Sequence, residues 1–435
     1  MVEPSLSNDP DHPMTGLGVY VHFPWCLKKC PYCDFLSVAV KSPDETRYAT
    51  RNEAQQTLPH AAYATAVINE FEARFARLWR HPHFAPPRLK SVFFGGGTPS
   101  LWEPRELGRA LGAVLRGFSE QPGGLAADLE ITVECNPTSV DIDHFKALRD
   151  VGVNRISIGV QGLDQERLEF LGRLHDPSGA LRAIDAALSA GMPQVSADLI
   201  YGLYRQSPDQ AASEVTRVAR LGVHHVSAYM LTVEENTRFG ALHARGKLPL
   251  LDDALVAESY AQVHDALGEQ GFEHYEVSNF ARAGSRSVHN TGYWLGRDYL
   301  GLGTGAYGTV SFPSALPTAQ PARLRYRNFI VPERYIESWA PAHPTLDPFT
   351  SLSTEQEWLD PDTAVSEALM LGLRLSDGVD LDVVEHLRGP STRKAARQRT
   401  IERLLTDGKL KRVGNALQLP PEHWIVADSV IRQLL

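Results

Sequence analysis

Short β-rich runs alternate with amphipathic helical stretches from residue 17 to residue 229, and this alternation is the strongest constraint on the fold. It is typical of a parallel sheet whose strands are joined by helical crossovers. We predict strands at residues 18–23, 91–94, 130–134, 155–161, 195–200 and 225–230. We predict helices between them at residues 104–118, 141–151, 179–190 and 209–221. The pattern predicts an α/β fold built on a complete or partial (β/α) barrel.

The fourth predicted strand, RISIGVQ, has two different faces. Its apolar residues alternate with Ser157, Gly159 and Gln161, so one face suits packing against helices and the other is small and polar. The interior of a small packed barrel is usually apolar. A polar inner face therefore indicates a binding site inside the barrel.

Length and composition limit the domain organisation, the partners and the location that we expect. The chain has 435 residues, enough for one large domain with a smaller appendage, and a formal net charge of −9, which disfavours nucleic acid and anionic lipid as partners. Mean hydropathy is −0.24, and we find no apolar run of about 18 residues, so we expect a soluble protein without a transmembrane segment. Residues 1–16 show no secretory or transit pattern, and we expect a disordered tail there and a cytoplasmic location.

The remaining segments predict two loops or insertions and a small C-terminal domain. Two segments interrupt the alternation, at residues 36–62 and 312–323, and we expect both to be loops or insertions. Helical stretches after residue 355, followed by the hairpin-like LKRVGNALQL, predict a small winged-helix-like domain. Its last 59 residues carry 10 Lys and Arg against 8 Asp and Glu, so we expect a packing module rather than a DNA-binding domain. The predicted boundaries are a barrel with following elements at 17–310, a linker or loop region at 311–355 and a mainly helical domain at 356–435.

Three of the four cysteines, Cys26, Cys30 and Cys33, lie within eight residues directly after the first predicted strand. Such crowding is unlike a disulfide framework. Structural zinc takes four protein ligands, and neither Cys135 nor His22 completes a second pair at a suitable spacing. Three cysteines can instead hold a four-iron four-sulfur cluster with one iron open to an external amine and carboxylate. A cluster of buried, reduced thiols and an adventitious zinc site are the alternatives.

The CLKKCPYC segment resembles the signature of the radical S-adenosylmethionine superfamily, in which an aromatic residue, here Tyr32, precedes the third cysteine. The resemblance implies a 4Fe-4S cluster held by Cys26, Cys30 and Cys33. It also implies a partial barrel of the radical S-adenosylmethionine type, with S-adenosylmethionine bound at the carboxyl ends of the strands, where barrel sites lie.

Further motifs at the predicted strand ends match the superfamily. The glycine run in GGGTPS lets the backbone approach a ligand closely, and a buried carboxylate in the third strand needs a cationic or hydroxyl partner. For each polar residue taken alone, the alternative is a core position satisfied by a neighbour. The resemblance implies that S-adenosylmethionine is bound by Tyr20, Tyr32, Gly96, Gly97, Thr98, Glu134, Gln161, Arg173 and Asp198.

Within the superfamily, the motifs from YVHFPWC to DLIYGL resemble the oxygen-independent coproporphyrinogen III oxidase-like group. The oxidases carry a fourth cysteine where this chain has Phe35, whereas HNTGYW, which begins at His289, matches the motif of the HemW-type haem chaperones. The resemblance implies that haem binds at His289 beside aromatic side chains and is handed to acceptor proteins. Physical chemistry alone favours a core histidine there. Tyr204 and the long 36–62 connection depart from the group pattern and put loop geometry in question.

Two other functions stay open at this stage. A coproporphyrinogen III oxidase, a radical oxidative decarboxylase, is the main alternative, and radical chemistry on an unrelated substrate is the third. The favoured hypothesis is a haem chaperone on a radical S-adenosylmethionine scaffold, which assigns no catalytic residue. It predicts haem, a 4Fe-4S cluster and S-adenosylmethionine as cofactors, and haem-accepting proteins as partners.

Overall fold

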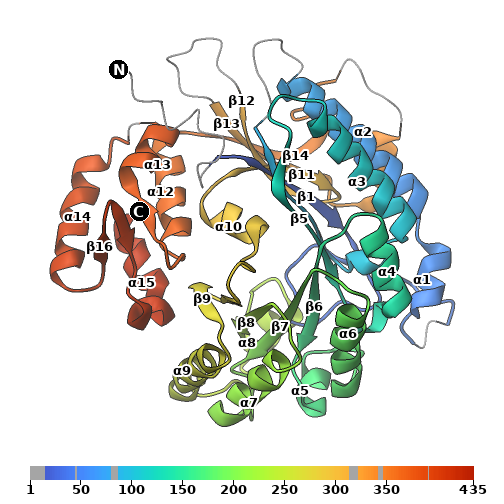
Figure 1. Ribbon diagram of the computed structural model, residues 1–435, viewed down its shortest axis with the longest axis horizontal. Helices are drawn as coiled ribbons and strands as arrows, with labels where there is room; N and C mark the ends of the chain where they lie inside the picture. The colour runs from blue at the N-terminus through green and yellow to red at the C-terminus, as the bar shows by residue number, and fades with distance from the viewer. Residues whose placement is uncertain (1–14, 45–46, 80–86, 313–321, 341–345, 390) are drawn as a thin grey trace.

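The computed structural model describes residues 15–44, 47–79, 87–312, 322–340, 346–389 and 391–435. The predicted tail at 1–16 and the proline-rich loop at 312–323 therefore lie almost entirely outside the described residues. Figure 1 shows a curved sheet with helices on its outer face and a smaller C-terminal lobe beside it. Among the described residues, no helix is long and apolar enough to cross a membrane.

A twelve-stranded sheet forms the larger part, in the order β14-β13-β12-β11-β1-β4-β5-β6-β7-β8-β10-β9. Seven neighbouring strands are parallel: β11 (Asp298–Gly303), β1 (Leu17–Phe23), β4 (Leu89–Gly96), β5 (Leu125–Cys135), β6 (Arg155–Gln161), β7 (Gln194–Tyr201) and β8 (His225–Met230). All six predicted strands are present, while β11 was not predicted. Because the order ends at β14 and β9 instead of closing on itself, the barrel is partial, and the predicted fold class is confirmed.

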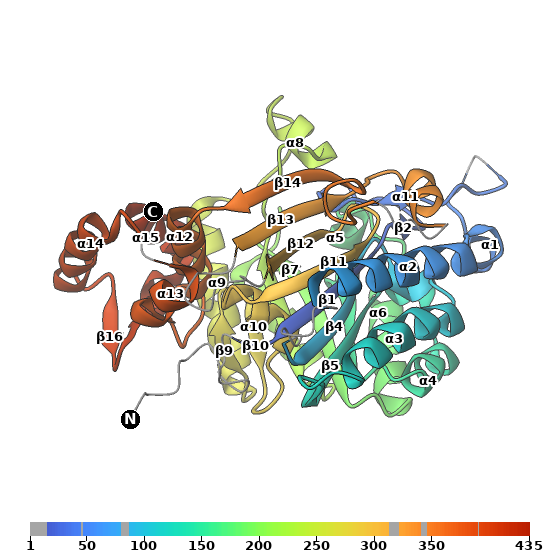
Figure 2. The same cartoon turned by 90° about the horizontal axis from the view of Figure 1, so that it is seen from above.

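Helices cover the outer face of the parallel strands, as Figure 1 shows. They are α1 (Arg51–Thr57), α2 (His60–Trp79), α3 (Pro104–Ser119), α4 (Ile142–Asp150), α5 (Gln165–Phe170), α6 (Pro177–Ser189), α7 (Pro208–Ala219) and α9 (Asp253–Glu269). The short helix α8 (Arg238–His243) projects away from the sheet, as Figure 2 shows, and Phe239 donates its backbone N–H to the carbonyl of Pro31 in the cysteine loop (2.9 Å). The four predicted helices agree with α3, α4, α6 and α7 to within two residues at each end. Asp141, Asp176 and Ser207 accept a backbone N–H at the starts of α4, α6 and α7, as good N-cap residues do.

The prediction that residues 36–62 form a loop or insertion is wrong in part. The segment contains β3 (Val38–Ala39), all of α1 and the first residues of α2. Thr50 and Glu53 form a capping box that starts α1, since each side chain accepts a hydrogen bond from the other residue's backbone N–H. Helix α2 then packs against α3, α11 and β11, with Tyr63 and Phe71 on its buried face.

The prediction of a linker at residues 311–355 is also wrong. This region holds β13 (Ala322–Asn328), α11 (Pro332–Trp339) and the start of β14 (Ser353–Leu359). With β12 (Tyr307–Phe312), these strands extend the sheet beyond β11 as antiparallel neighbours. At the other end, β10 (Asn279–Ala281) and β9 (Glu273–Glu276) add two more antiparallel strands. The extension was missed because its strands are polar on the face that carries Arg325 and Glu357.

The C-terminal lobe contains α12 (Pro361–Gly372), β15 (Val379–Asp380), α13 (Leu381–Arg388), α14 (Lys394–Thr406), β16 (Lys411–Val413), β17 (Ala416–Gln418) and α15 (Ala427–Ile431). Strands β16 and β17 pair as the wing expected from LKRVGNALQL, and β15 completes a three-stranded sheet. The lobe has its own apolar core around Leu369, Ile401 and Leu404. Its predicted start at residue 356 falls inside β14, which belongs to the large sheet.

The lobe is joined to the open side of the barrel. Figures 1 and 2 both show it beside β9 and α9. Val277 donates its backbone N–H to the carbonyl of Arg374 (3.1 Å), and Ser376 donates to the carbonyl of Tyr275 (2.9 Å). Close to this junction, α10 (Val288–Trp294) packs inside the barrel against β4 and β1.

Candidate functional site

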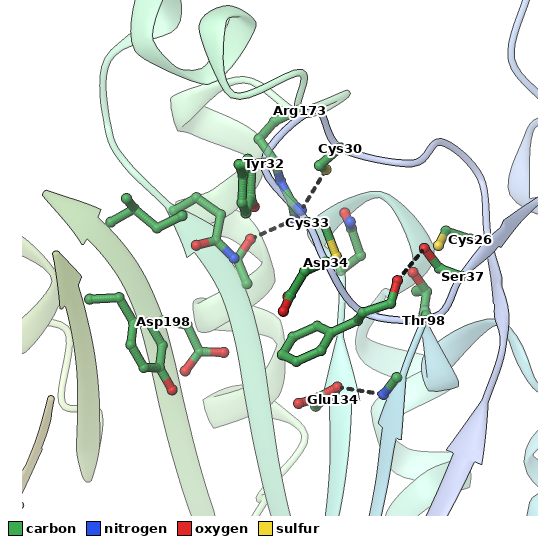
Figure 3. Close-up of a pocket in the computed structure, with 18 of the residues that line it drawn as sticks. Cys26, Cys30, Tyr32, Cys33, Asp34, Ser37, Thr98, Glu134, Arg173 and Asp198 are labelled. Carbon is green, nitrogen blue, oxygen red and sulfur yellow. Dashed lines mark hydrogen bonds between the residues drawn. The ribbon is translucent and has the colours of Figure 1, made fainter. Parts of the chain in front are cut away.

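A cavity of about 410 Å³ opens at the carboxyl ends of the parallel strands. Figure 3 shows Arg173 and the three clustered cysteines on one side of this cavity, and Glu134 and Asp198 on the other. The residues that line it include Cys26, Cys30, Tyr32, Cys33, Gly96, Gly97, Thr98, Glu134, Gln161, Arg173 and Asp198. The fold thus brings together all three predicted metal ligands and eight of the nine residues predicted to bind S-adenosylmethionine.

The cysteine loop is closed at its base. Strand β2 (Trp25–Cys26) pairs with β3, and Val40 donates its backbone N–H to the carbonyl of Cys26 (2.8 Å). A turn follows, in which Cys33 donates to the carbonyl of Cys30 (3.3 Å). Arg173 lies 3.6 Å from the Cys30 sulfur, so a fixed cation faces the position of a thiolate.

Burial raises the pKa of the Cys26 thiol and raises the pKa of Cys33 to about 12. Such thiols become ligands when a metal displaces their protons. Among the described residues, no three His, Cys, Asp or Glu side chains converge as they would on a single metal ion. A four-iron cluster is wider than one ion, so its three thiolates can stand around a cavity, and this donor set fits such a cluster.

The glycine run at the carboxyl end of β4 lies directly against β1 and β2. Gly97 donates its backbone N–H to the carbonyl of Phe23 (2.7 Å), and a Cβ atom on Gly97 would lie 2.6 Å from the carbonyl oxygen of Trp25. Gly96 has φ of +110°, and a Cβ atom there would strike the His22 ring. Larger residues would push the strand ends apart, which explains why two successive glycines are needed.

Two carboxylates face the cavity from neighbouring parts of the barrel. Glu134 accepts a hydrogen bond from the Gly96 N–H (3.1 Å), and Asp198 accepts one from the Ser157 hydroxyl (2.9 Å). Desolvation, followed by the nearby charge of Asp198, raises the pKa of Glu134 to about 8. A bound cation would relieve this repulsion. The pair therefore fits the positively charged amine and sulfonium groups of S-adenosylmethionine.

The raised pKa of Glu134 predicts a pH effect on stability. In unfolded chains a glutamate has a pKa of about 4.3, so the folded protein holds an extra proton between that pH and about 8. Folding is therefore destabilised as pH rises through this window. We expect Glu134→Gln to remove this slope, so that the free energy of unfolding of the variant, relative to that of the wild type, rises by about 3–4 kcal/mol between pH 5 and pH 8.

The measurement is urea denaturation of the cofactor-free protein at several pH values. Glu120→Gln, at the exposed end of α3, is the matched control and should follow the wild-type profile. Equal slopes for Glu134→Gln and the wild type would contradict the prediction.

Gln161 ends β6 in an unusual conformation. Its φ of +66° lies in the left-handed region, and the pairing with β7 shifts register between Gly159 and Gln161. The Arg173 guanidinium donates to the carbonyl of Gly159 (2.9 Å) and so stabilises this bulge. A non-glycine residue with positive φ is strained and persists only where the surrounding structure stabilises that conformation. Such residues cluster at functional sites.

A second cavity, of about 290 Å³, lies next to the first and deeper in the barrel. Phe35, Gly96, Glu134, Ser157, Asp198 and Tyr229 line both cavities. Tyr20 lines this deeper cavity but not the first, and its hydroxyl lies 2.9 Å from His22 Nδ1, so it shares a cavity with Gly96, Glu134 and Asp198 but not with the other predicted cofactor contacts. We call this second cavity the lumen cavity.

His289 forms part of the wall of the lumen cavity. It lies on α10, is 4% exposed, and stacks on Phe93 with ring centroids 4.8 Å apart. Its Nδ1 lies 2.8 Å from the Ser91 hydroxyl, whereas its buried Nε2 has no hydrogen-bond partner among the described residues. Burial lowers the pKa of His289 to about 3, so the ring is neutral. A neutral imidazole with one free nitrogen is the form that binds metals.

Sequence reasoning missed several residues of these cavities. Tyr229 and Met230 end β8 and are each 40% exposed at the wall of the first cavity, and His225 and Arg155 lie in the lumen cavity. The polar positions in HVSAYM and RISIGVQ were the available signal, since inward-facing residues alternate along each strand.

Comparisons with known proteins agree with this geometry. The profile of the Radical SAM superfamily matches residues 20–218, and that of the HemN C-terminal domain matches residues 359–426. The solved structure of "Coproporphyrinogen III oxidase (HemN) from Escherichia coli" superposes with a TM-score of 0.71 at 20% identity, covering 97% of this chain and 91% of that one, which shows a shared fold. The chain thus has the fold of the radical S-adenosylmethionine superfamily.

Its relatives place it more narrowly. "Heme chaperone HemW" of Escherichia coli is 37% identical over 77% of this chain and 80% of its own length. The protein of the same name from Mycobacterium tuberculosis is 33% identical over 99% of this chain and 97% of its own length. The chain therefore belongs to the HemW family. The predicted family is confirmed.

Proposed function

We propose that this protein binds haem and hands it to acceptor proteins, as the names of its relatives suggest. One observation carries the proposal: His289 is neutral and presents a ring nitrogen without a partner beside the lumen cavity. Phe93 and Tyr293 flank its ring, which supplies the aromatic surroundings that suit a porphyrin.

We also propose that Cys26, Cys30 and Cys33 hold a 4Fe-4S cluster and that the adjoining cavity binds S-adenosylmethionine. The cavity suits both groups, because it places three thiols and Arg173 on one side and two carboxylates on the other. Bound together, these groups would supply the redox chemistry of the superfamily. Cysteines that hold such a cluster must stay reduced, which favours a reducing compartment such as the cytoplasm.

Replacing His289 with alanine tests the haem assignment. We expect the dissociation constant for haem to rise at least about tenfold, because the free imidazole nitrogen is lost and 1.4 kcal/mol of binding energy already corresponds to a factor of ten. The measurement is a haem titration of anaerobically reconstituted protein, followed by Soret absorbance. His243→Ala, at an exposed histidine of α8, is the control and should bind like the wild type.

The same preparation tests the main alternative. It is incubated with coproporphyrinogen III and assayed for deoxyadenosine and carbon dioxide. We expect saturable haem binding without turnover. Turnover without specific haem binding would instead identify a decarboxylase. An unchanged titration of His289→Ala would remove that residue from the haem site.

A further inference from the structure

The helix that carries His289 begins on a buried carboxylate of another element. Glu130, on β5, accepts hydrogen bonds from the Ser287 hydroxyl (3.2 Å) and from the backbone N–H groups of Val288 (2.9 Å) and His289 (3.0 Å). Its side chain is only 7% exposed. One carboxylate thus satisfies three donors at the N-terminus of α10, where negative charge is favoured.

Arg155 holds this carboxylate from the neighbouring strand. Its guanidinium lies 3.7 Å from Glu130, and it also donates to the carbonyl of Ser285 (3.2 Å), just before α10. Arg155 is 3% exposed. A buried pair of this kind is rigid, because moving either partner leaves the other charge without compensation.

A second contact with the start of α10 comes from β9. The Tyr275 hydroxyl accepts the backbone N–H of Ser287 (3.2 Å) and lies 2.9 Å from His225 Nε2. The other nitrogen of His225 lies 2.8 Å from the Ser196 hydroxyl. Glu130 of β5 and Tyr275 of β9 therefore bind the start of a seven-residue helix directly. Arg155 of β6 supports Glu130, and His225 of β8, itself beside Ser196 of β7, supports Tyr275.

The side chain of His289 makes fewer hydrogen bonds than the backbone at the start of α10. Ser91 is its one hydrogen-bond partner among the described residues, and Nε2 has none. The position of Nε2 therefore depends on the backbone of His289, whose own N–H is one of the groups that Glu130 binds. A metal ligand held through such indirect contacts is sensitive to their loss.

We propose that Glu130 is the positioning residue for His289: through the N-terminus of α10 it sets where the free ring nitrogen lies, and so sets how haem is coordinated. This inference rests on the proposed haem site. It assigns a role to a residue at the amino ends of the strands, away from the cysteine cavity, and does not require Glu130 to contact haem.

The test compares the haem complexes of the full-length, cluster-reconstituted wild type, Glu130→Gln and His289→Ala. A glutamine side chain places an amide N–H donor opposite the backbone N–H groups from which the carboxylate accepts. The N-terminus of α10 should therefore lose its hydrogen bonds to residue 130. We expect the absorption and resonance Raman spectra of Glu130→Gln to move toward those of His289→Ala. We also expect haem to pass to apomyoglobin at least tenfold faster than from the wild type.

Asp141→Asn is the matched control. Asp141 also accepts a backbone N–H at a helix start, from His144 (2.8 Å), and pairs with an arginine, Arg51 (2.6 Å), but it lies at α4. We expect its spectrum to equal that of the wild type and its transfer rate to stay within twofold. A change as large as that of Glu130→Gln would mean that any lost helix cap has this effect, and would overturn the proposal.

Ser287→Ala is a milder variant in case Glu130→Gln does not fold. It removes one of the three donors to Glu130, together with the hydroxyl that accepts the Asn290 backbone N–H (3.2 Å), and should speed haem transfer about threefold. Its haem spectra should shift in the same direction as those of Glu130→Gln. Wild-type spectra and rates in the folded Glu130 variant, or in Ser287→Ala if only that variant folds, would overturn the inference. If the wild type and His289→Ala give the same spectrum, the haem assignment itself fails, whatever Glu130 does.

Discussion

Replacing Cys30 with alanine is expected to abolish assembly of the iron-sulfur cluster. Three cysteines face the cavity as a set, and a four-iron cluster with one open iron uses all three. After anaerobic reconstitution we expect iron to fall from about four atoms per chain to less than one. The charge-transfer absorption of the cluster should disappear with it. Iron and sulfide analysis, together with the visible spectrum, measures both effects.

Cys135→Ala is the control for this experiment, because Cys135 lines the same cavity. Its thiol sits at the end of β5, where it donates to the carbonyl of Val133 (3.7 Å), and burial raises its pKa. It belongs to the regular sheet and lies outside the cysteine loop. We expect this variant to keep its cluster. A full cluster in Cys30→Ala, or its loss in Cys135→Ala, would show that the wrong thiols were assigned.

The parallel strands could be predicted because each combines β-rich residues with a flanking helix of clear periodicity. Strand β11 was not predicted, since its DYLGLG sequence carries two glycines and its partner β1 lies far away along the chain. Helix α1 left a usable signal in the capping box of Thr50 and Glu53, which was not used. The strands of the antiparallel extension carry charged residues that satisfy one another across the sheet, as Arg325 and Glu357 do.

The cavity with the cysteines was largely predictable, because its residues lie in motifs at the ends of successive strands. The lumen cavity was not, since it forms only when α10 folds back into the barrel and brings His289 beside Ser91. Tyr20 shows a related limit: it lies three residues before the end of β1 and lines the lumen cavity, which it shares with Glu134 and Asp198, but not the first cavity. Depth along a strand depends on register, which the motifs do not encode.

The antiparallel extension is joined to the barrel by a buried ion pair on α2. Glu70 and Arg74 are both fully buried and lie 3.0 Å apart. Arg74 donates to the carbonyl of Gly301 on β11 (2.9 Å) and to Asn328 on β13 (2.7 Å). Glu70 accepts from the backbone N–H of Gly303 (2.8 Å) and from the Asn328 amide (2.6 Å). The pair therefore connects one outer helix with β11 of the barrel and β13 of the extension.

Arg74→Met is expected to lower the free energy of unfolding by about 3–5 kcal/mol, since it leaves Glu70 charged or forces it to take up a proton inside the core. Burial already raises the pKa of Glu70, and Arg74 is the strongest influence opposing that shift. Adding Glu70→Gln should recover part of the loss, because the amide removes the uncompensated charge while keeping some hydrogen bonds. Urea denaturation of the single and double variants measures both effects. A double variant that is less stable than Arg74→Met would mean that the contacts of Glu70 with Gly303 and Asn328, more than its charge, hold the extension in place.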